Sequence, residues 1–195
     1  MIISHRINTV DALKSTPLKY GVEVDIQMVN GRLVTGHDPG LVEEEFDDWL
    51  STFGHVLLAA NIKQEGIEQA VISACEDRGV RNFFLFDLSF PKLFQLQDQG
   101  ESRIAVRVSD MEGFSNLHRF VDKADWVWLD AFEDYAFIHD ALPILKKFRV
   151  CLVSPELHVG RDLSINLRLK SQLMKLGVRF EAICTKEPSL WEIQP

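Results

Sequence analysis

The chain alternates short apolar runs with longer amphipathic stretches along its whole length. Short apolar runs bounded by turn residues predict buried strands, and apolar residues spaced three and four apart predict helices. The runs that we interpret as strands are residues 2–5, 22–29, 55–63, 82–88, 104–108, 126–131, 149–153 and 180–184. The stretches that we interpret as helices are residues 9–15, 42–53, 67–77, 93–99, 114–123, 137–147 and 163–176.

This regular alternation of strands and helices predicts an α/β fold with a parallel sheet. Eight strands separated by helices favour a compact (β/α)8 TIM barrel, formed as a single domain over residues 1–195. Such barrels usually have ~250 residues, so this chain is near the lower limit and an open doubly wound sheet is the alternative. Neither a GxGxxG nor a GxxxxGK[ST] phosphate loop occurs in the sequence.

Polar residues gather where the predicted strands end. In a barrel of this type the carboxyl ends of the strands carry the active site. A lone Asp or Ser at such a position is about as often a helix cap as a functional group, so position alone assigns no role. The residues concerned are His5, Arg6, Glu23, Asp25, His37, Asp38, Asn61, Lys63, Asp87, Ser89, Arg107, Ser109, Asp130, Glu156, His158, Thr185 and Lys186.

Glu23 and Asp25 are the most informative pair among them. They are two residues apart in a predicted strand, so their side chains point to the same face. Burying two like charges is unfavourable unless a cation joins them. Carboxylate oxygens suit hard divalent ions, and the pair therefore predicts a magnesium or calcium site.

Charge and composition narrow the range of partners. The chain has 21 Lys and Arg against 29 Asp and Glu, a formal net charge of −8. This acidic balance argues against a general nucleic-acid binder or a binder of anionic membranes, but a local pocket can still bind a small anion. The three cysteines show no CxxC spacing, which argues against a structural zinc site. An odd number of cysteines with no cleavable leader fits a reducing compartment. No signal-peptide core and no apolar run of ~20 residues occurs, so we expect a cytoplasmic protein without membrane insertion. The oligomeric state stays open.

Two blocks of sequence resemble the glycerophosphodiester phosphodiesterase family. The first block is strongly similar to the family's start, and the second resembles its closing strand. The first block contains His5-Arg6, Asn8-Thr9, Gly21 with Glu23 and Asp25, Gly31 with Val34, and His37-Asp38. The second runs from Gly177-Val178 to Thr185-Lys186-Glu187-Pro188.

The resemblance implies a barrel of the phosphatidylinositol phospholipase C-like superfamily and a set of site residues. It implies that His5 and His37 are the acid/base pair and that Arg6 holds the phosphate. It also implies that Glu23 and Asp25 bind the metal. The family's third strand usually ends in E-x-K, whose Glu binds metal and whose Lys contacts phosphate. Here that position is Asn61-Ile62-Lys63, which keeps the lysine and supplies a neutral carbonyl in place of the carboxylate.

We therefore expect a metal-assisted phosphodiesterase that hydrolyses a glycerophosphodiester or a similar small diester. Two histidines can divide the acid and base roles, while cations stabilise charge on the phosphoryl oxygens. Arg107 and Glu156, from later strands, are expected to contact the substrate. Two alternatives remain: transfer within the substrate that forms a cyclic phosphate, and a catalytically weakened barrel that binds a phosphorylated ligand. The Asn61 substitution favours the second alternative.

Overall fold

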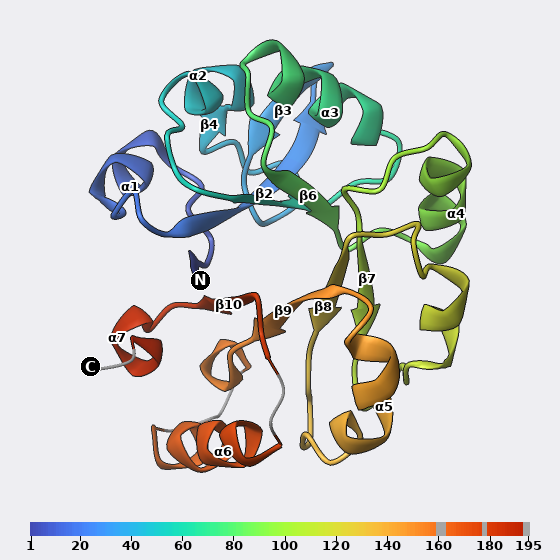
Figure 1. Ribbon diagram of the computed structural model, residues 1–195. Coiled ribbons are helices and arrows are strands. Elements are labelled where there is room, and N and C mark those ends of the chain that lie inside the picture. The colour runs from blue at the N-terminus through green and yellow to red at the C-terminus, as the bar shows by residue number, and fades with distance from the viewer. Residues whose placement is uncertain (159–162, 177–178, 193–195) are drawn as a thin grey trace. The chain divides into compact units, whose positions relative to one another are not determined.

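The computed structural model describes residues 1–158, 163–176 and 179–192 (Figure 1). The chain divides into two compact units, residues 3–94 and residues 1–2 with 95–195. The Gly177-Val178 part of the predicted closing motif lies outside the described residues.

The first unit contains four parallel strands in the order β1-β2-β5-β6. The strands are β1 (Ile2–Ser4), β2 (Gly21–Val29), β5 (Leu58–Ile62) and β6 (Phe83–Phe86). Helices α1 (Val10–Ser15), α3 (Glu68–Asp77) and α4 (Phe90–Asp98) follow β1, β5 and β6. Every residue of β5 and β6 is buried, as expected for parallel strands covered on both faces.

A hairpin extends β2 beyond its parallel partners. The chain reverses at Asn30-Gly31, where φ is 50° and 77°, as a two-residue hairpin turn of the primed type requires. Strand β3 (Arg32–Thr35) then pairs antiparallel with β2, and the two-residue β4 (Glu44–Glu45) pairs with β3. The prediction of one helix over 42–53 is therefore wrong at its start. Pairing with β3 holds Glu44–Glu45 extended, and helix α2 spans only Phe46–Ser51.

The second unit has a matching set of four parallel strands in the order β7-β8-β9-β10. These are β7 (Ala105–Val108), β8 (Trp126–Leu129), β9 (Arg149–Val153) and β10 (Ala182–Thr185). Its α-helices are α5 (Ile138–Leu145), α6 (Leu163–Lys175) and α7 (Pro188–Trp191), and Figure 1 shows α5 and α6 beside these strands. The start of the chain also belongs here, because Ile183 N donates to Met1 O at 3.0 Å.

One predicted helix of this unit takes another form. The segment expected to be an α-helix over 114–123 contains the 3₁₀ helix η1 (Ser115–Arg119). Its hydrogen bonds join residues three apart, from Leu117 N to Phe114 O and from Phe120 N to Leu117 O. Leu117 and Phe120 are both fully buried, and a three-residue repeat places them on one side. A second 3₁₀ turn, η2 (Pro155–Leu157), follows β9.

The expected α/β class is confirmed, because each unit supplies four parallel strands with connecting helices. Among the described residues, no helix is both long and apolar enough to cross a membrane.

Candidate active site

Glu23 lies where β2 passes the end of β1. The parallel register pairs Ser4 with Val22, which brings His5, the residue after β1, to Glu23. His5 Nε2 is 3.7 Å from Glu23 Oε2, and Glu23 has no exposed surface. Arg6 N donates to the same oxygen at 2.6 Å, from a backbone with φ of 57°. A left-handed backbone at a residue other than glycine is unfavourable, and such residues often cluster at functional sites.

Asp25 is also buried and is surrounded by donors. Asn8 Nδ2 donates to Asp25 Oδ2 at 3.0 Å, and Asn8 Oδ1 accepts from Asp25 N at 2.9 Å. The Arg6 guanidinium is 3.7 Å from one carboxylate oxygen, and Lys63 Nζ is 3.6 Å from the other. Arg6 and Lys63 are thus held beside a buried carboxylate, and both keep N–H donors for an anionic ligand.

Asn61 is the direct partner of Asp25 in the parallel register of β2 and β5. Asn61 Oδ1 and Glu23 Oε1 are both buried, and neither accepts a hydrogen bond within the part of the chain that is described. Buried polar atoms without partners are rare in folded proteins, and a bound ion is one way to satisfy them.

The charge state of Glu23 depends on what fills this position. Burial raises the pKa of Glu23 to about 8, and the nearby Asp25 charge adds to the increase. Hydrogen bonds from the Arg6 backbone and the Asn61 side chain lower the pKa, while Asp87 raises it further. Without a cation, therefore, the Glu23 carboxyl keeps its proton at neutral pH.

These groups fit a hard divalent cation that is bound by few protein ligands. Glu23, Asp25 and Asn61 would supply oxygen atoms only, which suits magnesium or calcium. Among the described residues, no group of three or more His, Cys, Asp or Glu side chains gathers in a metal-binding arrangement. The set therefore has two carboxylates and one neutral amide, and we expect weaker binding than with a third carboxylate.

His37 lies in the loop that follows β3. Gly36 N donates to Asp25 O at 3.0 Å, so the loop leaves the β2 backbone one residue before His37. The His37 side chain is 36% exposed, and its Nδ1 is 2.8 Å from Asp38 Oδ1. A carboxylate at Nδ1 fixes the ring and leaves Nε2 for a reacting group.

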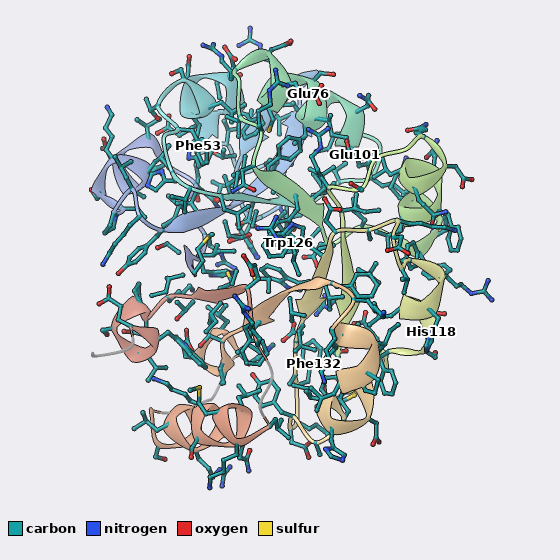
Figure 2. The ribbon with its side chains drawn as sticks, viewed as in Figure 1. Phe53, Glu76, Glu101, His118, Trp126 and Phe132 are labelled. Atoms are coloured by element: carbon teal, nitrogen blue, oxygen red, sulfur yellow. The ribbon has the colours of Figure 1, made fainter. Side chains whose placement is uncertain are left out.

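The second unit carries its own polar cluster at the carboxyl ends of β7 and β8. Asp130, nearly buried, accepts from Arg107 Nη2 at 3.1 Å and lies 2.6 Å from His158 Nε2. The Phe132 ring, labelled in Figure 2, is 5.0 Å from the His158 ring and 5.5 Å from the Arg107 guanidinium carbon. Arg107 thus belongs to a group with Asp130 and His158, for which sequence patterns indicated only a position at a strand end.

Glu156, the other residue expected to contact substrate, is held differently. Its carboxylate accepts hydrogen bonds from the hydroxyls of Ser154 and Thr185. The backbone N–H of Lys186 also donates to it, at 3.3 Å. These contacts join the end of β9 to the end of β10, and the role of Glu156 towards substrate stays a prediction.

The sequence interpretation assigned no role to two residues of the first unit, although it quoted Asn8 in the block that resembles the family. Asn8 orients Asp25, and Gln27 bonds the loop that carries His37. A weak signal for Gln27 was available, because it continues the two-residue spacing of Glu23 and Asp25 along β2.

Comparisons with known proteins agree on the fold. No family model and no curated protein matches the sequence. A glycerophosphodiester phosphodiesterase from Agrobacterium tumefaciens is 15% identical with a TM-score of 0.65, covering 97% of this chain and 96% of its own. A candidate enzyme of that name from Galdieria sulphuraria is 12% identical with a TM-score of 0.70, covering 96% and 94%. A chain of the tryptophan synthase complex from Pyrococcus furiosus is 12% identical with a TM-score of 0.55, covering 94% and 85%.

At such low identity these similarities establish the fold and leave the activity to be argued from the site. The tryptophan synthase chain shows that proteins of different activity share this architecture. The chain has the α/β fold of a compact (β/α)8 barrel, and it resembles the glycerophosphodiester phosphodiesterases over nearly its whole length.

Proposed function

We propose that this protein is a metal-assisted phosphodiesterase that hydrolyses a glycerophosphodiester or a similar small diester. The observation that carries the proposal is a meeting of charged groups where β2 passes the ends of β1 and β5. Strand β2 supplies Glu23 and Asp25, and the residues that follow β1 and β5 are His5, Arg6 and Lys63. This group combines an imidazole, paired carboxylates and two basic side chains, which suits the proton transfer and charge stabilisation that cleavage of a phosphodiester needs.

The basic side chains of Arg6 and Lys63 bind the substrate phosphate. Arg6 and Lys63 approach the Asp25 carboxylate from 3.7 and 3.6 Å, so each is held in place yet retains donors for a phosphoryl oxygen. A cation held by Glu23, Asp25 and Asn61 would neutralise charge that develops on the phosphoryl group. Glu23 would then be ionised, because a positive charge nearby favours the carboxylate.

The two histidines move the protons. His5 takes the proton of the attacking water as a new bond forms between the water oxygen and phosphorus. His37 gives a proton to the leaving alcohol oxygen as its bond to phosphorus breaks. Asp38 at Nδ1 of His37 supports this role by orienting the ring, which leaves Nε2 for the leaving oxygen. Arg107 and Glu156 are proposed to select the substrate.

A second candidate function is a barrel that binds a phosphorylated ligand without cleaving it. Asn61 favours this function, since it removes one negative charge from the metal ligands. The placement of His5 beside Glu23 favours the enzyme instead, because binding alone requires no group to accept a proton.

Steady-state kinetics on two substrates tests the proposal. We expect His5→Ala and His37→Ala each to lower kcat on an alkyl diester by about 10² to 10⁴. A nitrophenyl leaving group needs no acid. With that substrate, kcat should fall much less in His37→Ala, whereas in His5→Ala it should fall by the same factor as with the alkyl diester. His118→Ala, at an exposed position of η1, is the control. Folded His5 and His37 variants with wild-type rates would refute the mechanism, and phosphate binding without turnover would favour the second function.

A further inference from the structure

The loop of residues 36–41 holds His37 outside any helix or strand. Most of its residues are exposed, and loops of this kind are usually the most mobile parts of a fold. A catalytic acid needs a fixed position, because an error of about 1 Å can lower a rate 10²-fold. The loop therefore needs an internal support.

Gln27 supplies that support from within β2. Its side chain is only 5% exposed. The carboxamide nitrogen lies 3.0 Å from Gly36 O, 3.0 Å from Asp38 O and 2.8 Å from Leu41 O. Its oxygen accepts from Gly40 N at 2.9 Å. One side chain thus bonds four backbone groups, on both sides of His37.

The chemistry of these contacts is specific to an amide of this length. The two hydrogens of the NH₂ group serve three carbonyls, while the carbonyl oxygen serves one N–H. A glutamate at position 27 would keep the acceptor for Gly40 but lose the donors, and a methionine would lose both. Because Gln27 is buried, the abandoned carbonyls would be left without partners, which is unfavourable.

Gly36 allows the loop backbone to approach Gln27 and Leu41 closely. Its φ is 154°, and a Cβ there would lie 2.1 Å from Leu41 O and 3.1 Å from Gln27 Nε2. Its N–H bonds to Asp25 O at 3.0 Å. The loop is thus joined to Asp25 by its backbone and to Gln27 by side-chain bonds, both on the same strand.

We propose that Gln27 is a positioning residue that fixes the His37 loop relative to the Glu23 and Asp25 carboxylates. This inference rests on the proposed function, in which His37 donates the proton to the leaving alcohol. In this role Gln27 makes hydrogen bonds only to the loop backbone, and it affects the reaction through the position of His37.

A double-variant comparison tests this role. We expect Gln27→Met to lower kcat on an alkyl diester by about 10- to 100-fold, with KM and metal affinity changed less than about twofold. The loss should shrink with a nitrophenyl leaving group. Gln27→Met with His37→Ala should be no slower than His37→Ala alone, since Gln27 acts only through His37. Gln64→Leu is the matched control, because Gln64 also bonds the β2 backbone, at Met28 N.

Hydrogen exchange gives a readout that does not depend on activity. The Gly36 and Gly40 amides should exchange at least about tenfold faster in Gln27→Met than in the wild type. Gln27→Glu serves as the second variant if Gln27→Met does not fold. Unchanged exchange, unchanged kcat, or rate losses that multiply in the double variant would overturn the inference. A wild type without hydrolysis, or His37→Ala at the wild-type rate, would instead overturn the proposed function, and this role with it.

Discussion

Asp25 and Asn61 are direct partners in the parallel pairing of β2 with β5, yet the Asn61 side-chain oxygen is buried and accepts no hydrogen bond among the described residues. Glu23 Oε1, two residues before Asp25 on β2, is likewise buried without a hydrogen bond from that part of the chain. The two atoms define the position at which we expect a cation.

Metal affinity should follow the charge of this ligand set. Glu23→Gln should weaken magnesium or calcium binding by about tenfold or more, and Asn61→Glu should strengthen it by a similar factor. Calorimetry on metal-stripped protein measures both, with Glu43→Gln as an exposed acidic control. Equal affinities in all four proteins would place the metal elsewhere.

Asn8 should increase metal affinity although it is not itself a metal ligand. Its side chain makes two hydrogen bonds to Asp25, one to the carboxylate and one to the backbone N–H. Groups that orient metal ligands typically contribute 10- to 100-fold in affinity, so we expect Asn8→Ala to lose about that much. The same calorimetric titration checks it, and a loss under about twofold would show that Asp25 needs no such support.

The metal-free protein should lose stability as the pH rises. The Glu23 carboxyl has a pKa of about 8 in the fold against the ordinary 4.5. Between these values the folded state binds more protons than the unfolded state, so the free energy of unfolding falls with rising pH. The contribution of this group is fully present below about 4.5 and is lost as the pH passes through about 8.

Urea unfolding in a chelator, from pH 5 to pH 8, measures this slope. Glu23→Gln should flatten it, because the amide does not titrate. Saturating metal should reduce this slope in the wild type, because metal binding releases the Glu23 proton from the folded state. Identical slopes for wild type and variant in chelator would show that Glu23 is already ionised.

The cluster around Asp130 should contribute to stability. Asp130→Asn removes the charge that Arg107 and His158 share, in a nearly buried position. We expect the free energy of unfolding to fall by about 1–3 kcal/mol. Asp140→Asn, at an exposed position of α5, is the control for urea unfolding. Equal stability of the two variants would show that the cluster contributes little to the fold.

The sequence predicted most of the strands because each is a continuous apolar run, as in Phe83–Phe86. It did not predict the β3–β4 hairpin, since Arg32–Thr35 is short and the acidic Glu44–Glu45 also fits a helix start. Thr35 pairs with Glu44 and Val34 with Glu45 across the loop that carries His37, and the apolar pattern of either segment alone does not show this pairing.

The site residues, like the strands, could be predicted from the sequence only in part. Glu23 and Asp25 could be recognised because two carboxylates in an apolar strand are unfavourable unless they bind a cation. Gln27 shares their face of the strand, but a neutral amide there is ordinary and does not by itself indicate a function. Its importance depends on the loop folding back over it, which only the three-dimensional structure shows.

Phosphorus NMR of a glycerophosphodiester incubated with the protein tests the central claim most directly. We predict that a phosphomonoester accumulates with magnesium or calcium present and that a chelator stops it. We also predict that His5→Ala and Glu23→Gln lower the rate by about 10² or more. A cyclic phosphate as the final product would replace hydrolysis by transfer within the substrate. An unchanged diester, with metal and folded wild-type protein present, would contradict the account.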